Sequence, residues 1–435
     1  MARRVLKKRK QESVEPKLPT RRITFRIYPI PGQEAILVEW LGLHCELYNA
    51  AIQERRDAWK RCGIGVNYVA QANQLPEIKA LRPELLVMGA HALQATLRRA
   101  DLAFQHYFDR VKAKKDGSRR KVGYPRFKAR ARFKGWTYPD HDNWKLLQAT
   151  PGKHGFLDIK HLGKLRIRGK ARTWGKDSTL TITRKGDEWF ASVTVACQPV
   201  RECGTEALAF DWGLENFITL STGEKVASPR FLKAAEDRLK KAQRDLSRKF
   251  GPDKRHRSRK PSKGWLKAQE VLRKRHQDVQ NQRENFHHQE SATLIKRAAL
   301  LVTETLGIQG MTASAKGSVE KPGKNVKQKA GLNRAILDSA PGGFLAKCAY
   351  KAEEARCMDV RIEPRKWKPS QTCPGCGRQM KKSLKERVHL CPECGLQAGR
   401  DHAAALVMLN VALTGKPWES GLRGADLLPP GRGAA

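Results

Sequence analysis

The sequence predicts an α/β protein of several domains, and three observations support that prediction. The chain has 435 residues, enough for two to four domains, and 40% of them are hydrophobic, enough for several cores. Short apolar strands bounded by turns alternate with long helical stretches along most of the chain. Near the carboxyl end, four cysteines in two Cys-x2-Cys pairs indicate a small metal-binding module.

The charge balance narrows the class of partner. The chain has 86 Lys and Arg against 43 Asp and Glu, a formal charge of +43. Such a chain repels itself unless a polyanion neutralises it, so nucleic acid is the expected partner. A membrane surface is the alternative, but we find no run of eighteen apolar residues and no signal-peptide pattern. We therefore expect no membrane partner. Six scattered cysteines beside the four paired ones fit a reducing compartment.

The amino-terminal region predicts a tail, a strand and a helical block. Residues 1–20 are basic and lack apolar periodicity, so we expect a disordered, solvated tail or, alternatively, a targeting signal. Residues 21–30 alternate charged and apolar side chains as one strand does. Helices are expected from about residue 32, at about 68–80 and at about 88–114. The basic faces of these helices could lie on a nucleic-acid backbone.

Short strands follow this helical block. They are expected at residues 157–159, 164–167, 180–183 and 189–195. The turn at Lys185-Gly186-Asp187 predicts a hairpin. Such spacing indicates a small barrel or sandwich, completed by the strand at 21–30 with the helical block inserted. Three aromatic residues lie among Lys and Arg and would serve either as stacking platforms for bases or as core: Trp136, Tyr138 and Trp144.

Three acids stand at the ends of apolar elements. Asp211 ends an apolar strand and precedes a Gly-containing turn, and two further strands follow it up to residue 227. An acid in the first strand of such a meander resembles the RNase H fold. Glu304 ends another strand that begins at about residue 300, and Asp401 opens an apolar helix at 403–413. Read singly, each acid is a solvated strand or helix end. Together they can converge on divalent cations, and Mg²⁺ prefers oxygen ligands of this kind.

Two long helices carry the densest positive charge. Apolar residues repeat from Leu232 to Leu246, and a second helix returns from Trp265 to Phe286. The cations that we expect to track phosphates, rather than only to solvate a face, are Lys240, Lys241, Arg244, Arg248, Arg255 and Arg257. Residues 312–331 are predicted to form a basic loop, with a helical region from Leu332 and a strand at 358–362.

The four paired cysteines predict a structural zinc site. Cys373 and Cys376 form one knuckle, and Cys391 and Cys394 form the other. Fourteen residues lie between Cys376 and Cys391. Four thiolates at this spacing can hold one Zn²⁺ tetrahedrally, and a redox dithiol is the weaker alternative. The four cysteines fill the coordination shell, so we interpret His389 as an ordinary surface histidine.

Several of these stretches together resemble a known family. They are residues 25–29 (FRIYP), 123–128 (GYPRFK), 209–214 (AFDWGL), 302–306 (VTETL) before Gly310-Met311, 370–377 (SQTCPGCG), and Arg400-Asp401 before Ala404-Ala405. In order and spacing they are similar to the TnpB proteins of transposons and the compact type V CRISPR effectors. The resemblance spans about residues 21–414, which is most of the chain.

The resemblance implies an architecture. It implies a disordered basic tail at 1–20, a β-barrel wedge domain at 21–30 and 122–203, a helical recognition domain at 31–121, an RNase H-like (RuvC) nuclease domain at 204–368 and 398–415, an inserted zinc ribbon that binds target nucleic acid at 369–397, and a disordered tail at 416–435.

The resemblance also implies a function. A guide RNA would pair with target DNA next to a short adjacent motif, and Asp211, Glu304 and Asp401 would hold two Mg²⁺ ions that cut the DNA. The location would be the bacterial cytoplasm, at the nucleoid in use. Family members usually carry Asn two residues after the third acid, where this chain has Ala403. A guided DNA-binding protein with weak or absent cleavage is therefore an alternative, as is a zinc-ribbon nucleic-acid binder without a guide.

Overall fold

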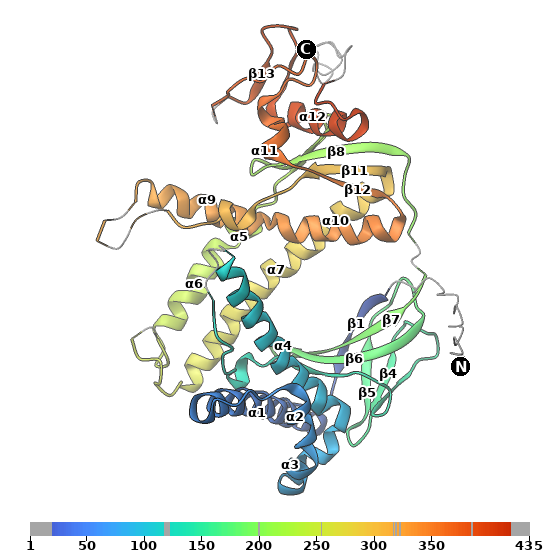
Figure 1. Cartoon of the computed structure of the whole chain (residues 1–435), viewed down its shortest axis with the longest axis vertical. Coiled ribbons are helices and arrows are strands. Elements are labelled where there is room, and N and C mark those ends of the chain that lie inside the picture. Colours follow the sequence, from blue (N-terminus) through green and yellow to red (C-terminus); the bar gives the residue numbers. More distant parts are fainter. Residues whose placement is uncertain are drawn as a thin grey trace, which may run out of the picture. The chain divides into compact units, whose positions relative to one another are not determined.

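A computed structural model of the chain describes residues 20–116, 122–198, 201–253, 255–315, 317, 320–321, 323–383 and 386–418 (Figure 1). The chain divides into two compact units, Met1–Pro199 and Val200–Ala435, each built around its own hydrophobic clusters. The tails predicted at 1–20 and 416–435 lie outside the described residues, except for Thr20 and residues 416–418.

The first unit contains one antiparallel sheet of seven strands. They are β1 (Thr20–Tyr28), β2 (Gly135–Tyr138), β3 (Trp144–Leu147), β4 (Gly155–Ile159), β5 (Gly163–Arg168), β6 (Lys176–Lys185) and β7 (Glu188–Ala196). Their order is β2-β6-β7-β1-β5-β4-β3, so β1 belongs to this sheet, as the sequence predicted, and lies in its middle. The predicted hairpin joins β6 to β7, where Gly186 has a φ of 66°.

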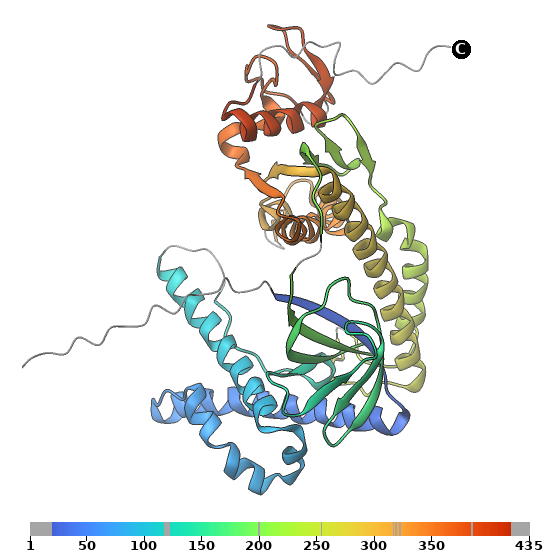
Figure 2. The ribbon, with the colours of Figure 1, turned by 90° about the vertical axis from the view of Figure 1, so that its right-hand side faces the viewer.

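The sheet of the first unit curls around its core (Figure 2). The sequence predicted a barrel or a sandwich, and the structure shows a single sheet whose edge strands are β2 and β3. Trp136, Tyr138 and Trp144 are only 2%, 1% and 2% exposed. Their interpretation as stacking platforms for bases is therefore wrong, because rings packed inside the sheet present no face to a nucleotide.

Helices are inserted between β1 and β2. They are α1 (Pro31–Cys62), α2 (Tyr68–Asn73), α3 (Leu75–Leu81), the 3₁₀ helix η1 (Pro83–Met88) and α4 (Ala90–Lys115), followed by the 3₁₀ helix η2 (Arg130–Arg132). The predicted helix at 68–80 is thus two helices, because Asn67 caps α2 and Pro76 begins a new turn in α3. Leu37, Ile52, Leu93 and Leu97 are among the buried residues that join α1 and α4 to the core.

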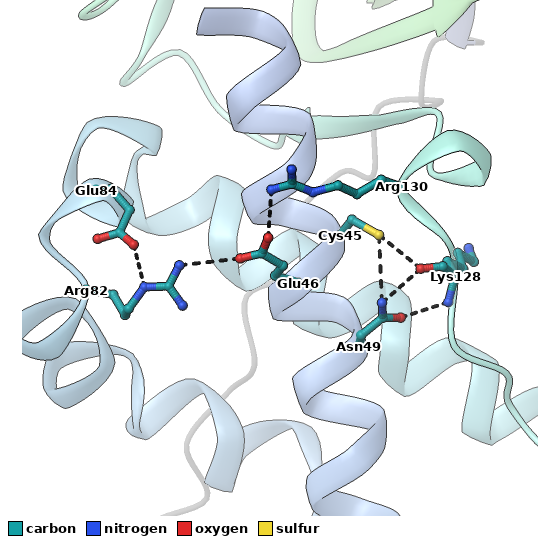
Figure 3. Close-up of polar contacts among 7 residues, drawn as sticks. All are labelled: Cys45, Glu46, Asn49, Arg82, Glu84, Lys128 and Arg130. Atoms are coloured by element: carbon teal, nitrogen blue, oxygen red, sulfur yellow. Dashed lines mark hydrogen bonds and ion pairs between the residues drawn. The ribbon is translucent and has the colours of Figure 1, made fainter. Parts of the chain in front are cut away.

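The segment at 123–128 has neither helix nor strand, and the side chain of Asn49 on α1 fixes its end (Figure 3). Asn49 donates a hydrogen bond to the Lys128 carbonyl at 2.9 Å and accepts one from the Lys128 amide at 2.8 Å. Cys45 donates to the same carbonyl at 3.2 Å. Nearby, Glu46 binds Arg130 at 2.7 Å. An amide side chain thus satisfies backbone groups that no strand pairs.

The second unit is organised around a mixed sheet of five strands. They are β8 (Glu206–Trp212), β9 (Asn216–Leu220), β10 (Lys225–Ala227), β11 (Ala298–Glu304) and β12 (Met358–Ile362). Their order is β10-β9-β8-β11-β12. The first three form an antiparallel meander, whereas β8, β11 and β12 run parallel. All five strands match the expected positions.

Helices cover both faces of this sheet (Figure 1). On one face, α7 (Lys263–Arg297) and α10 (Pro341–Ala355) pack against side chains such as Leu208, Phe210 and Leu301. On the other face, α12 (Arg400–Thr414) packs against Ala209, Leu300 and Val302. Successive residues of β8 alternate between these two faces, as the period of a strand requires.

The remaining helices of the second unit extend from the sheet. They are α5 (Phe231–Ala234), α6 (Glu236–Ser247), α8 (Ile308–Met311), α9 (Val326–Ser339), α11 (Pro364–Trp367) and the 3₁₀ helix η3 (Pro369–Gln371). Helices α6 and α7 pack together as the predicted helical pair. Helix α9 begins six residues earlier than Leu332, so the predicted basic loop is shorter, and residues 316, 318, 319 and 322 of it lie outside the described part.

A two-stranded ribbon of β13 (Val388–Leu390) and β14 (Gln397–Gly399) leads directly into α12. Its two cysteine pairs lie before and after β13. Of the helices described, none combines the length and the apolar character that crossing a bilayer requires.

Candidate functional site

Two of the three predicted acids leave the sheet on the same face. Asp211 lies two residues after Ala209, and Glu304 lies two residues after Val302. Since Ala209 and Val302 face α12, the period of the strands places both carboxylates on that face. Strands β8 and β11 are neighbouring and parallel, so both acids also stand at the same edge of the sheet.

The third acid comes from the helix that covers this face. Asp401 is the second residue of α12. Its Oδ2 atom would be 3.8 Å from a Cβ atom placed on Gly213, in the turn after β8. The first turn of α12 therefore holds Asp401 above the end of the strand that carries Asp211.

The surroundings of Asp211 and Glu304 oppose ionisation of their carboxyl groups. Burial, and then the carboxylates of Glu304 and Asp401, hold the pKa of Asp211 well above its ordinary value, against the opposing effect of Arg400. Burial also raises the pKa of Glu304. The three carboxylates do not all lie within 4.8 Å of one another, since the described residues form only two such groups and neither contains them. A divalent cation among the acids would relieve their repulsion.

A histidine that the sequence did not single out fixes the start of α12. His402 is buried, and its Nε2–H donates to the carbonyl of Ser221 at 3.0 Å. Ser221 in turn bonds β8, because its amide donates to the Ala209 carbonyl at 2.8 Å and its Oγ accepts from the Ala209 amide at 3.0 Å. The helix that carries Asp401 is thereby tied to the strand that carries Asp211. A histidine next to an acid at the start of an apolar helix was the available sequence signal.

Ala403 does not lie at the acids. It is 1% exposed and packs with Cys373, Cys391 and Ala398 of the ribbon. Two residues along a helix correspond to a rotation of about 200°, so the side chain at 403 points away from that of Asp401. The structure therefore gives no reason to expect that the lack of an amide at position 403 weakens the carboxylate site.

The four predicted cysteines converge as a group that could hold a metal ion. The Sγ atoms of Cys373 and Cys394 are 3.6 Å apart, and those of Cys376 and Cys391 are 3.5 Å apart. Each knuckle closes in the same way, because the amides of Gly377 and Gly395 donate to the carbonyls of Cys373 and Cys391, both at 3.0 Å. These glycines have φ values of 79° and 69°, which side chains with a Cβ rarely adopt.

His389 contradicts its interpretation as a surface histidine. It is fully buried between the knuckles and contacts the amine of Lys382 through Nδ1. Burial, and then the charge of Lys382, lowers the pKa of His389 to about 4. The prediction was wrong because β13 turns this residue inward, and alternation over three residues is too short to be recognised in a sequence.

The cations predicted to track phosphates lie on one hairpin of helices. Lys240, Lys241 and Arg244 are exposed on α6, and Arg248 is exposed just after it. Arg255 and Arg257 are exposed in the connection to α7. Their exposure allows contact with a phosphate backbone, and Lys240 additionally pairs with Glu236 at 3.1 Å.

Family models match three parts of the chain. A family model described as "Probable transposase" (OrfB_IS605) matches residues 190–315, and one described as "Cas12f1-like, TNB domain" matches 342–408. A third, described as "Helix-turn-helix domain", matches 20–63. The structure there consists of strand β1 and the single helix α1, so the name does not describe the conformation of these residues.

Two curated relatives align along most of the chain. "Putative RNA-guided DNA endonuclease InsQ" of Escherichia coli (strain K12) is 26% identical, over 82% of this chain and 84% of its own length. A "Putative RNA-guided DNA endonuclease" of Streptomyces pristinaespiralis is 27% identical, over 93% of this chain and 92% of its own length. A solved Cas12f1 complex with sgRNA and target DNA has a similar fold, with a TM-score of 0.53 and 11% identity over 90% of this chain and 99% of its own.

The fold resembles that of the solved Cas12f1 protein, and the four-cysteine ribbon lies within the match to the TNB-domain family model. The matches confirm the resemblance drawn from the sequence motifs: this chain is similar to TnpB proteins and compact type V effectors.

Proposed function

We propose that the protein is an RNA-guided DNA endonuclease. A guide RNA would pair with one strand of target DNA beside a short adjacent motif, and the protein would hydrolyse phosphodiester bonds. The observation that carries the chemistry is the placement of Asp211 and Glu304 at one edge of the sheet, beneath Asp401 of α12. The names of the two curated relatives support the guide and the target. Acting on DNA would place the protein at the bacterial nucleoid, in the cytoplasm.

We assign catalytic magnesium to the three acids. The donors are all carboxylate oxygens, which suit Mg²⁺, and a bound cation would offset the burial and the neighbouring carboxylates that raise the pKa of Asp211. When bound, two such ions supply charge neutralisation at the phosphate and activation of water. Asp211 and Glu304 would hold the ions from the rigid strand ends, and Asp401 from the helix. Strand ends and a helix start move little, which keeps the three ligands in position.

We assign structural zinc to Cys373, Cys376, Cys391 and Cys394. Tetrahedral Zn²⁺ with bonds of about 2.3 Å places its sulfur ligands about 3.8 Å apart, close to the two measured separations. Four thiolates leave no open position, so this ion would take no part in cleavage. It would instead fix the ribbon from which α12 starts, and with it the approach to Asp401.

The proposed function also assigns a role to each part of the fold. We propose that the five-stranded sheet with its helices is the RuvC-like nuclease domain at 204–368 and 398–415, with the zinc ribbon at 369–397 inserted. The curled sheet would be the wedge domain at 21–30 and 122–203, and the helices at 31–121 the recognition domain. The cations Lys240 to Arg257 would contact phosphates of the guide or the heteroduplex.

The alternative, guided binding with weak or absent cleavage, rested on Ala403. Since Ala403 packs against the ribbon and points away from Asp401, nothing at the acids favours that alternative.

The proposal is tested on the full chain with its co-purifying RNA. Sequencing of that RNA defines the guide, and a matched DNA target is then offered with Mg²⁺, with Mn²⁺ and with chelator. We expect cleavage with either metal and none with chelator. Asp211→Ala should abolish cleavage and leave RNA binding intact, whereas Asp245→Ala, which removes an exposed acid on α6, should change neither. An intact target in the wild-type reaction, or cleavage that survives Asp211→Ala, would refute the assignment.

A further inference from the structure

A large pocket lies in the second unit beside the turn that follows β8. Its volume is about 970 Å³, at the upper end of the range of small-ligand sites. It is bounded by the turn at 214–215, the first turns of α5 and α6, and parts of α7 and α9. Nothing in the proposed cleavage chemistry uses this pocket.

Aromatic rings form one side of the pocket. Phe286 lies 5.0 Å from Phe217 and 5.9 Å from Phe231, measured between ring centroids. Phe217 is buried, whereas Phe231 and Phe286 keep part of their surface exposed within the pocket lining. Exposed ring faces in a concave site are platforms on which a planar group can stack.

Positive charge surrounds these rings. Six cations line the pocket, namely Arg230, Lys233, Lys240, Arg283, Arg334 and Arg387, against the three acids Glu215, Glu236 and Asp338. The carboxylate of Asp338 is already engaged by other groups of the pocket lining, because it accepts hydrogen bonds from Arg283 at 2.9 Å and from the Leu232 amide at 3.0 Å. Glu236 is shared by Lys240 and Arg334. Neither Arg230 nor Lys233 forms an ion pair with another described residue.

One residue that lines the pocket, Arg230, has a strained backbone conformation. Arg230 has φ 46° and ψ 49°, a left-handed conformation that non-glycine residues rarely adopt. The hydrogen bond from Leu232 to Asp338 stabilises the turn that begins there. Backbone strain of this kind persists where surrounding contacts enforce it, often at ligand sites. Arg230 is exposed and lines the pocket immediately before Phe231.

The position of the pocket relative to Asp211 favours a single nucleic-acid strand as its ligand. Leu214 and Glu215 line it and follow Asp211 by only three and four residues, at most roughly 14 Å of extended chain. Phe217 lies on the opposite sheet face from the acids, so a strand that passes the acids must round the β8–β9 turn to enter. A single strand can make this bend, whereas a duplex of ordinary stiffness cannot.

We propose that this pocket binds unpaired nucleotides of the DNA strand being cut, with bases stacked on Phe231 and Phe286 and phosphates paired with Arg230 and Lys233. The inference rests on the proposed function, because it takes DNA rather than guide RNA as the ligand that passes Asp211. Filling the pocket would anchor the strand a few nucleotides from the acids and so fix which phosphate lies over them.

The first test measures binding without cleavage. A short single-stranded oligodeoxynucleotide that contains 2-aminopurine is titrated into the full chain carrying Asp211→Ala, and stacking is followed as fluorescence quenching. Adding Phe231→Leu should weaken binding about tenfold, in the range for loss of one base–aromatic stack. Lys233→Gln should lower the log–log salt slope by about 0.7. Phe250→Leu, a matched exposed phenylalanine outside the pocket, should change neither quantity. Equal affinities for the Phe231 and Phe250 variants would overturn the proposal.

The second test separates DNA from RNA. In the assembled complex, 5-iodouracil is placed either in the unpaired part of the DNA strand or in the guide, and crosslinked peptides are mapped. Crosslinks from DNA to the peptides that carry Phe231 or Phe286 support the proposal, whereas crosslinks to these peptides from the guide alone overturn it. Quenching in the Asp211→Ala protein, combined with a wild-type complex that leaves a matched target intact in Mg²⁺, would refute the endonuclease function while retaining the pocket.

Discussion

His402 donates a hydrogen bond to the backbone carbonyl of Ser221 at 3.0 Å, and both residues are buried. The two lie 181 residues apart in sequence. Ser221 is bonded in both directions to Ala209 on β8, so the contact joins the helix of the third acid to the strand of the first. This hydrogen bond, together with the packing of α12 on Ala209 and Val302, therefore holds Asp401 relative to Asp211.

His402→Ala should lower both stability and cleavage. The free energy of unfolding should fall by about 1–3 kcal/mol, because the Ser221 carbonyl stays buried without its donor. Cleavage should fall as well, because the first turn of α12 loses its tether. Denaturant unfolding and cleavage rates measure the two effects, and His402→Gln, which keeps an amide donor, should recover part of both. Unchanged cleavage in His402→Ala would show that the tether does not position Asp401.

Asp211→Asn should stabilise the protein while it abolishes cleavage. The pKa of Asp211 is higher in the folded state than in the unfolded state, so ionisation at neutral pH opposes folding. Removing the charge should therefore raise the melting temperature measured in chelator, and added Mg²⁺ should stabilise the wild type more than the variant. Cleavage should drop as far as in a variant that lacks all three acids, since ligands of one centre act as a unit. Asp245→Asn serves as the control, and a lower melting temperature for Asp211→Asn in chelator would contradict the prediction.

Cys376→Ser should remove zinc and loosen the ribbon. The other three thiols cannot close the tetrahedral shell, so metal content should fall from one zinc per chain towards zero. Hydrogen exchange should rise around residues 373–399. Cys203→Ser removes an exposed thiol of the same unit and should leave the zinc content unchanged. A Cys376→Ser protein that still carries one equivalent of zinc would disprove the assignment.

Ala403→Asn should destabilise the ribbon rather than increase cleavage. The position is closed by Cys373, Cys391 and Leu396, so an added amide would be buried without a partner at a cost of about 1–3 kcal/mol. Thermal unfolding and cleavage rates measure the outcome. Ala403→Ser, a smaller change, should cost less. Faster cleavage by Ala403→Asn would mean that residue 403 does act on the carboxylate site.

The first unit should lose stability in mild acid because of His44. Burial, and then the charge of Arg99, lowers the pKa of His44 to about 3, whereas an unfolded histidine titrates near 6.5. Between these values the unfolded state binds the additional proton, so stability falls as pH decreases, by about 1.4 kcal/mol per pH unit for one fully coupled proton. His44→Asn can keep the hydrogen bond to Thr96 and should flatten this dependence. His106→Asn alters an exposed side chain and should not. Tryptophan fluorescence during denaturant unfolding across pH 4–8 decides between them.

The local sequence pattern was sufficient to predict the strands of the second unit and the acids at their ends. Short apolar runs that end at an acid predicted β8 and β11. The period of a strand then places an acid on the same face as the residue two positions before it. The cysteine knuckles were evident for a similar reason, because their ligands lie three residues apart and their glycines follow immediately. Backbone geometry alone fixes such neighbours, whatever the rest of the chain does.

Only the tertiary structure decided which side chains meet across long separations. Trp136 and His389 are buried because a curled sheet and a three-residue strand enclose them, and neither enclosure has a local signature. Ala403 faces the ribbon because α12 packs between the ribbon and the sheet, which fixes the rotation of the helix about its axis. The contact of His402 with Ser221 and the rings of the pocket arise in the same way. Periodicity determines which face of an element is apolar, whereas the packing of one element on another determines what that face touches.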